Sequence, residues 1–312
     1  MYTEPVKLTP AFKDYLWGGT KLKTEYNKAS DLDIVAESWE LSTHKDGQSI
    51  VATGQYAGLT LSDMIEQCGH GILGSNAQKF DYFPILIKFI DAKDNLSVQV
   101  HPDDTYSLAH NGEYGKTEMW YILECEEGAS LYYGFNQTLT KEEFRRHIED
   151  NTLLSVLNKV PVKKGDVFFI PAGTVHAIGK GIVICEIQQN SNTTYRVYDY
   201  GRRDAQGNTR PLHIEQAITV SALSPAPEIH KAGGDILASC QYFTVRKISL
   251  NGEKNINIDT GCFHSIIVTD GGCILSMHGK ALALQKGDSV FIPAQDNSYT
   301  LEGMAEIILS YV

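Results

Sequence analysis

The sequence has no cysteine pairs of the kind that bind zinc or carry redox chemistry. Its six cysteines, at positions 68, 125, 185, 240, 262 and 273, form no C-x-x-C pair and show no short, regular spacing. Neither a thiolate metal site nor a dithiol motif is therefore supported. Cys125 and Cys185 lie in apolar, strand-like stretches, which predicts that they are small buried hydrophobic side chains.

Long apolar runs are also missing. The longest candidate, residues 83–90, is interrupted by Lys88 and is far shorter than the roughly 18 apolar residues of a membrane span. Residues 1–5 show no basic stretch followed by an apolar one, so no secretory signal is visible. We therefore expect a cytoplasmic protein with no membrane partner.

Positive charge is scarce relative to negative charge. The chain has 27 lysines and arginines against 38 aspartates and glutamates, a formal net charge of −11. This balance argues against nucleic acid as a partner, and an anionic substrate would need cations gathered locally. The length of 312 residues and the hydrophobic content of 42% suggest about two domains with sizeable cores.

The stretch 95–101 alternates between apolar and polar residues, as a half-buried strand does. It places Gln99 and His101 on one face. A second strand-like stretch, residues 115–122, carries Lys116 and Glu118 on one face.

A proline-glycine turn at residues 171–173 leads to a further imidazole. Taken singly, the residues have simpler interpretations: His101 could begin a turn, Glu118 could be a solvated charge, and His176 could be a core histidine. Together they predict two nitrogen and two oxygen ligands for one divalent ion. The predicted ligand set is Gln99, His101, Glu118 and His176.

The residues before His176 resemble the second metal motif of the cupin family. Gly165 is followed by five residues, then by the turn at 171–173, then by two residues and the histidine. In cupins these two turns present the histidine into a barrel. Lys180 stands where the family usually has asparagine.

An internal repeat divides the chain. Residues 286–294 echo residues 164–172 at a constant offset of 122. The same offset places Ser298 where the first copy has His176, so only the first copy should hold metal. Residues 224–227 form the best linker.

The remaining pattern is mostly that of strands. Residues 5–12 contain two prolines, which predicts an edge strand. We expect a mainly β protein of two cupin (jelly-roll) barrels with added helices: a catalytic domain over 1–223 and a C-terminal cupin-like domain, without ligands, over 228–312. Helices are expected at about residues 60–72, 140–158 and 211–222.

Four motifs in order resemble the type I phosphomannose isomerase family in its short bacterial form. They are residues 99–102, 116–121, 171–177 and 190–196, and the resemblance runs from about Trp17 to Leu223.

That resemblance implies a zinc-dependent isomerase of mannose 6-phosphate and fructose 6-phosphate. It implies one zinc per chain on the predicted ligand set, and a catalytic arginine matching Arg196. Gly115 and Asn192 stand where other members often have histidine and aspartate, so acid-base roles for those side chains do not carry over. A hexose 6-phosphate is the expected partner.

The chemistry of such a reaction agrees with these residues. A proton moves between C1 and C2 through an enediol, whose developing charge a metal ion and a guanidinium such as that of Arg196 can stabilise. Lys116 could open the sugar ring or polarise an oxygen, and Glu186 is the candidate base. Arg202 and Lys93 are possible phosphate contacts or solvated surface charges.

Two other functions stay open. Two histidines and a carboxylate also suit an Fe(II)-dependent cupin oxygenase. A cupin that only binds sugars would need neither Lys116 nor Arg196.

Overall fold

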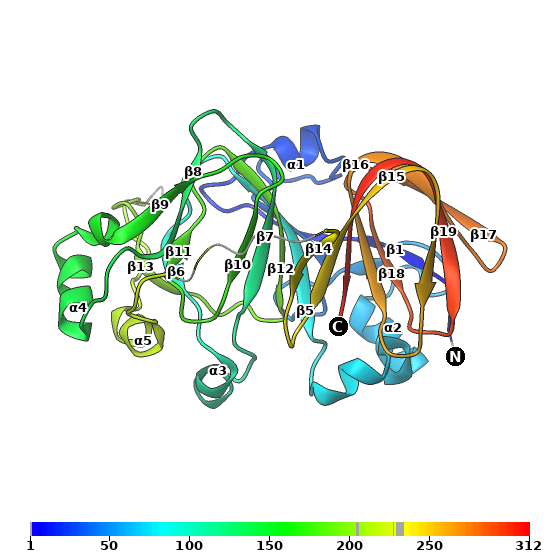
Figure 1. The fold of residues 1–312 in the computed structure, drawn as a ribbon, viewed down its shortest axis with the longest axis horizontal. Coiled ribbons are helices and arrows are strands. Elements are labelled where there is room, and N and C mark those ends of the chain that lie inside the picture. The colour runs from blue at the N-terminus through cyan, green and yellow to red at the C-terminus, as the bar shows by residue number, and fades with distance from the viewer. Residues whose placement is uncertain (1, 204–205, 227, 229–233) are drawn as a thin grey trace.

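The computed structural model describes residues 2–203, 206–226, 228 and 234–312. The chain is mainly β, with three sheets and short helices around them (Figure 1). The predicted linker extends to Pro227, which lies outside the described residues, as do residues 229–233 at the start of the predicted C-terminal domain.

A six-stranded antiparallel sheet forms the middle layer. Its strands β5 and β12 pair from Ile182 opposite Ala92 to Gln189 opposite Ile85. Both strands are buried throughout, because one face of the sheet packs toward the five-stranded sheet and the other toward the C-terminal sheet. Such two-sided burial explains the nearly continuous apolar run at 83–90. In sheet order the strands are β10 (Val167–Ile170), β7 (Glu118–Cys125), β12 (Ile182–Gln189), β5 (Ile85–Ala92), β3 (Glu37–Leu41) and β2 (Ala11–Lys13).

A five-stranded sheet faces this layer. Its strand β6 covers only Val98–Val100 of the predicted stretch 95–101, since Pro102 has no N–H to extend the ladder and Leu96 is held instead by the carbonyl of Ile178. The alternation within β6 is nevertheless as predicted. In sheet order the strands are β13 (Tyr195–Tyr198), β6 (Val98–Val100), β11 (His176–Ala177), β8 (Ser130–Phe135) and β9 (Leu157–Pro161).

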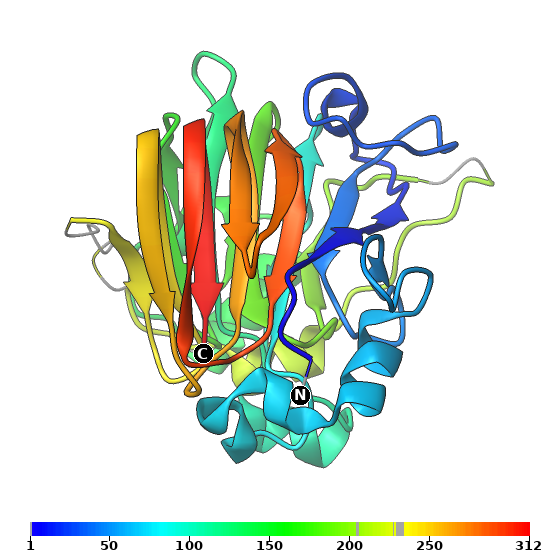
Figure 2. The ribbon, with the colours of Figure 1, turned by 90° about the vertical axis from the view of Figure 1, so that its right-hand side faces the viewer.

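The third sheet combines the C-terminal strands with two strands from the beginning of the chain. Its long strands run side by side in Figure 2. The predicted edge strand over residues 5–12 is wrong: Pro10 divides it, β2 joins the six-stranded sheet, and β1 lies between β18 and β4. In order the strands are β14 (Ile236–Ser239), β15 (Thr244–Ile258), β19 (Asn297–Tyr311), β16 (His264–Met277), β18 (Ser289–Ile292), β1 (Val6–Thr9) and β4 (Ile50–Val51), with β17 (Lys280–Gln285) paired to β16.

The internal repeat has a structural counterpart. Strands β10 and β18 occupy positions related by the offset of 122 residues. Gly165 and Gly287, which precede them, have φ values of 91° and 93°, a conformation that favours glycine. The repeat therefore preserves the same turn and strand.

The helices are shorter than the sequence indicates. Thr60 caps α2 (Leu61–Cys68) through the N–H of Asp63, and a 3₁₀ helix follows at His70–Leu73. The capping box at Thr140 is confirmed, but α4 ends at Glu149 and the chain enters β9 at Leu157, so the helix predicted over 140–158 is too long. Asn151, at φ 56°, breaks the helix. The remaining helices are α1 (Lys21–Thr24), α3 (Asp104–His110), α5 (Ile214–Val220) and the 3₁₀ segments Ser75–Lys79 and Leu153–Val156.

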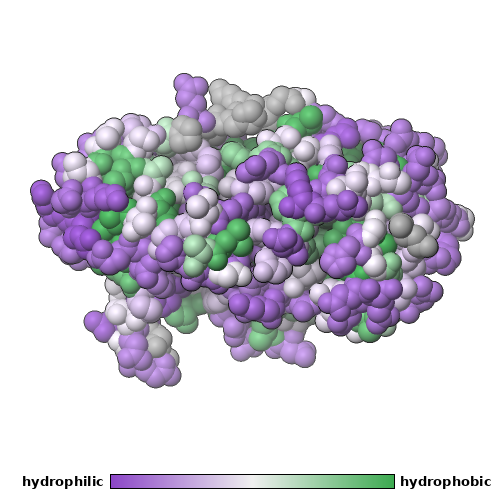
Figure 3. All heavy atoms as spheres, turned by 90° about the horizontal axis from the view of Figure 1, so that it is seen from below, coloured by the Kyte–Doolittle hydropathy of each residue, from purple (hydrophilic) through white to green (hydrophobic). Residues whose placement is uncertain are grey.

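Seen from below, the surface is mostly hydrophilic, with small apolar areas scattered over it (Figure 3). Among the described residues no helix has the length and apolar character needed to cross a membrane. All six cysteines are free; Cys185 is buried as predicted, whereas Cys125 is only partly buried.

Candidate active site and metal centre

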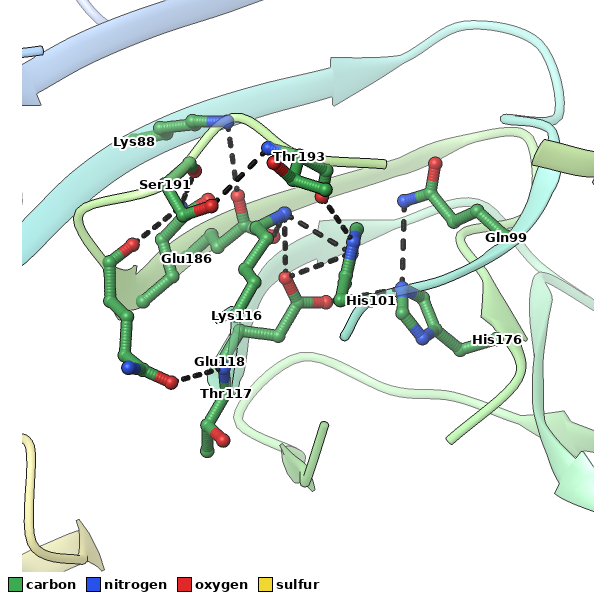
Figure 4. A network of polar contacts seen from close by, with 12 residues as sticks. Lys88, Gln99, His101, Lys116, Thr117, Glu118, His176, Glu186, Ser191 and Thr193 are labelled. Atoms are coloured by element: carbon green, nitrogen blue, oxygen red, sulfur yellow. Dashed lines mark hydrogen bonds and ion pairs between the residues drawn. The ribbon is translucent and has the colours of Figure 1, made fainter. Parts of the chain in front are cut away.

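The predicted ligands meet between the six-stranded and the five-stranded sheets. Gln99 comes from β6, His176 begins β11 directly opposite it, and Glu118 begins β7 on the facing sheet. His101 follows β6 by one residue. Figure 4 shows the four side chains converging on one space from segments far apart in the sequence.

The ligand atoms of His101, Glu118 and His176 all lie within 4.8 Å of one another. Nε2 of His176 is 3.3 Å from Oε1 of Glu118, and Nε2 of His101 is 3.5 Å from Oε2. Gln99 lies beside them, but its amide nitrogen is the atom that faces Nε2 of His176, at 3.5 Å. The amide must turn over before its oxygen can act as a ligand.

Backbone carbonyls orient both imidazoles. Nδ1 of His101 donates to the carbonyl of Thr193 at 2.9 Å, and Nδ1 of His176 donates to the carbonyl of Thr174 at 2.8 Å. Each Nε2 therefore keeps its lone pair free for the shared space. Burial lowers the pKa of His176 to about 4 and holds the pKa of His101 well below its usual range, so both rings are neutral at neutral pH.

Glu118 is completely buried, and its carboxylate is short of partners. Neither oxygen accepts a hydrogen bond of good geometry, although Nζ of Lys116 lies 2.8 Å from Oε2. Burial raises the pKa of this carboxyl to about 8. Because a buried charge that lacks partners is strongly destabilising, a cation between Glu118 and the two imidazoles would satisfy it. The residues fit a divalent metal ion.

A buried row of side chains with alternating charge lies next to this cluster. Nζ of Lys116 is 3.9 Å from Glu186, Nζ of Lys88 is 3.6 Å from Glu186, and Lys88 also lies 3.5 Å from Glu37. The indole N–H of Trp120 donates to Glu186 at 3.0 Å. Burial acts to raise the pKa of Glu186, but the two ammonium groups outweigh it and lower the pKa to about 2. Its carboxylate is ionised and weakly basic.

Arg196, in β13, points its guanidinium into the same region. Nε donates to Oγ of Ser97 at 3.3 Å, and a terminal nitrogen donates to the carbonyl of Pro211 at 3.1 Å. Burial and the nearby Arg210 lower the pKa of Arg196, which marks a region rich in positive charge. These two bonds fix the plane of the guanidinium.

A cavity of about 280 Å³ lies next to the buried cluster, because Lys116, whose Nζ is 2.8 Å from Glu118, and Gln99, beside His176, both line it. A larger cavity of about 310 Å³ lies beside His44 and Glu113, but Gln99, Lys116 and Arg196 do not line it. The smaller cavity is therefore the candidate active site. The charged and amide side chains lining it include Lys88, Gln99, Lys116, Glu186, Arg196 and Arg210.

Two of these residues were missed in the sequence. Lys88 appeared only as an interruption of an apolar run, yet a lone lysine in a buried strand is a signal that a carboxylate faces it. No pattern in the sequence around Arg210 indicates that it lines the cavity. Arg202 is bound instead to Asp199 and to the carbonyl of Asn95, and Lys93 is exposed.

Gly115 has a packing reason to lack a side chain. A Cβ at this position would lie 2.4 Å from the backbone carbon of Asp103. A histidine therefore does not fit here. Asn192 lines the cavity and donates from its amide to Asp46 at 2.9 Å.

Comparison with known proteins places these observations in a family. The mannose-6-phosphate isomerase ManA of Bacillus subtilis (strain 168) is 41% identical to this chain, over the whole of both proteins. The chain belongs to the type I phosphomannose isomerase family. The family model for the phosphomannose isomerase type I catalytic domain matches residues 6–127, and the model for the mannose-6-phosphate isomerase cupin domain matches residues 235–312.

Other members and solved structures agree with this assignment. The mannose-6-phosphate isomerase of Streptococcus mutans serotype c is 39% identical, over 99% of this chain and 98% of its own. The crystal structure of the mannose 6-phosphate isomerase from Bacillus subtilis superposes with a TM-score of 0.90 at 34% identity, covering both chains completely. A mutant of phosphomannose isomerase from Salmonella typhimurium shares the fold, with a TM-score of 0.82 at 19% identity over 98% of this chain and 99% of its own.

Proposed function

We propose that this chain is a zinc-dependent aldose-ketose isomerase that interconverts mannose 6-phosphate and fructose 6-phosphate. The observation that carries the proposal is the buried cluster of His101, Glu118 and His176, next to a cavity that Gln99, Lys116 and Arg196 line. Membership of the family, and the names of relatives that match over the full chain, support the choice of substrate.

One zinc ion per chain would be held by the two imidazoles, the Glu118 carboxylate and the Gln99 amide oxygen. When bound, it would supply a Lewis acid that withdraws charge from the sugar oxygens at C1 and C2. Nitrogen and oxygen donors suit zinc, and the two carbonyl-bound histidines are orientated for it. Among the described residues this cluster is the only group of its kind, and the repeat has Ser298 where the first copy has His176.

Arg196 would stabilise the charge that develops on the enediol. Its guanidinium stays charged and presents several donors in one plane, and its bonds to Ser97 and Pro211 hold that plane before the substrate arrives.

Glu186 would take the proton from one carbon and return it to the other. Its Oε2 atom accepts no hydrogen bond within the described structure, and it lies among the polar groups of the cavity. A carboxylate of low pKa is a weak base, so Arg196, and a metal ion when bound, would have to acidify the C–H bond. Lys116, whose Nζ is 3.9 Å from Glu186, would deliver a proton to a ring or hydroxyl oxygen.

The phosphate group would lie toward Arg210. A phosphate ester carries about −1.5 to −2 charges at neutral pH and favours guanidinium donors. Arg210 and Arg202 share the single carboxylate of Asp199, which leaves this end of the cavity positive in a chain of net charge −11.

The finer organisation of the chain belongs to the same proposal. The two sheets that enclose the site would form one cupin barrel within residues 1–223, and residues 228–312 would form a second barrel without ligands. Strands β1 and β4 add to the C-terminal sheet and would tie the two together. Six free cysteines favour a reducing compartment such as the cytoplasm.

A coupled assay that detects fructose 6-phosphate formed from mannose 6-phosphate, with and without a chelator, tests the function. We expect turnover that the chelator abolishes and zinc restores. Oxygen uptake with Fe(II) in place of isomerisation would show the oxygenase instead, and sugar binding without any turnover would show a binding protein.

A further inference from the structure

The loop between β12 and β13 orients His101, one of the two proposed ligand histidines. Thr193, whose carbonyl accepts the Nδ1–H of His101 at 2.9 Å, lies between the end of β12 at Gln189 and the start of β13 at Tyr195. The orientation of His101 therefore depends on whatever fixes Thr193.

Glu113 fixes it from another part of the chain. Its Oε1 accepts the hydroxyl proton of Thr193 at 2.6 Å, and its Oε2 accepts the backbone N–H of Asn192 at 3.3 Å. Glu113 comes from the segment between α3 and β7, about eighty residues earlier in the chain.

His44 orients this carboxylate in turn. Nδ1 of His44 accepts the backbone N–H of Asp46 at 3.1 Å, so the ring proton belongs on Nε2, which lies 2.9 Å from Oε2 of Glu113. The imidazole is buried. The side chains of His44, Glu113 and Thr193 thus form one series of hydrogen bonds, and the backbone carbonyl of Thr193 extends it to the ring of His101.

His176 provides the internal contrast. Its Nδ1–H donates to the carbonyl of Thr174, two residues earlier in its own segment. That bond is local and needs no support from Glu113. Only one of the two imidazoles depends on the long-range contact.

We propose that Glu113 is a positioning residue for the metal site: through Thr193 it fixes the tautomer and the ring orientation of His101. The inference rests on the proposed metal centre and assigns a role to a side chain that touches neither metal nor substrate. Groups that orient a ligand histidine in this way typically change metal affinity by roughly 10- to 100-fold when they are removed.

Zinc affinity of the full chain, measured by competition with a chromophoric chelator, tests the proposal without relying on activity. We expect Glu113→Ala and Thr193→Val each to weaken zinc binding by about 10- to 100-fold. The double variant should lose little more zinc affinity than the single variant that binds zinc more weakly, because both changes break the same hydrogen bond between Glu113 and Thr193. Thr193→Ser keeps the hydroxyl and should bind like the wild type. Glu127→Ala, at an exposed position, is the control.

Thermal unfolding of the metal-free proteins separates positioning from general support of the fold. A Glu113→Ala chain that unfolds at a lower temperature but binds zinc as tightly as the wild type would overturn the inference. A Thr193→Val chain with the zinc affinity of the wild type would overturn it too. If Glu113→Ala does not fold, Thr193→Val carries the test. A folded wild-type chain that binds no zinc would overturn the metal centre itself and this inference with it.

Discussion

Replacing Arg196 with lysine keeps a positive charge in the cavity but removes the planar fork of donors. The guanidinium now makes two hydrogen bonds that hold its plane, at 3.3 Å to Ser97 and 3.1 Å to the carbonyl of Pro211. A lysine ammonium cannot keep both and also face the substrate. Losing one preorganised donor to developing charge typically costs roughly 3 to 4 kcal/mol, or about 100- to 1000-fold in rate. Since lysine retains the charge, we expect a loss of rate toward the lower end of this range.

The assay is steady-state conversion of mannose 6-phosphate, with zinc content measured on the same sample. We expect Arg196→Lys to lower kcat far more than it raises KM and to leave the metal content unchanged. Arg210→Gln is the matched comparison: it lines the cavity near the proposed phosphate end, so it should raise KM and leave kcat nearly unchanged. A near-normal kcat with only a raised KM in Arg196→Lys would refute a role in the transition state and would make Arg196 a phosphate anchor.

Three further changes give separate tests. His176→Ala should remove metal and activity together while the circular dichroism spectrum stays native; loss of that spectrum would show that the residue supports the fold. Lys28→Met should lower the free energy of unfolding in denaturant by about 3 to 5 kcal/mol, because it leaves the buried Glu40 carboxylate, 2.7 Å away, without its cation. Lys7→Met removes a cation from a partly exposed pair and should lower it by about 0 to 1 kcal/mol. Equal losses in the two variants would contradict the argument. Burial lowers the pKa of His264 to about 4 from 6.5, so the unfolded state binds more protons between these values and stability falls as the pH falls. His264→Gln should therefore remove about 2 kcal/mol of the stability lost between pH 7 and pH 5, and an unchanged pH dependence of unfolding would contradict it.

The sequence predicts that Gln99, His101, Glu118 and His176 lie together because the patterns that orient these side chains are local. Alternation in a short strand sets the direction of Gln99, and the turn before His176 sets the direction of its side chain. Even the shortening of β6 to Val98–Val100 leaves these directions intact. Short-range geometry was sufficient for this part of the site.

Features that depend on distant partners could not be predicted. Lys88 is tolerated in a buried strand because Glu186 lies directly opposite it on β12, and no local pattern pairs those strands. The split of residues 5–12 between two sheets depends on β18, almost three hundred residues later. The end of α4 follows from Asn151 at positive φ, whereas the sequence pattern predicts a helix that continues to about residue 158.

The hydrogen bonds that orient His101 also depend on residues far apart in the sequence. Glu113 and Thr193 are eighty residues apart in the chain, and only the fold brings them within 2.6 Å. Arg210 likewise enters the cavity from a segment without a recognisable motif. Contacts that only the fold brings together are therefore harder to predict than the direction of a side chain within one strand or turn.

Titration of the metal-free chain with zinc, with isomerisation of mannose 6-phosphate followed at each step, tests the account most directly. Activity should rise in proportion to added zinc and stop rising at one ion per chain, because His101, Glu118 and His176 form one cluster in the described structure. Full activity without zinc, or activity that continues to rise to two ions per chain, would contradict the assignment of catalysis to this single centre.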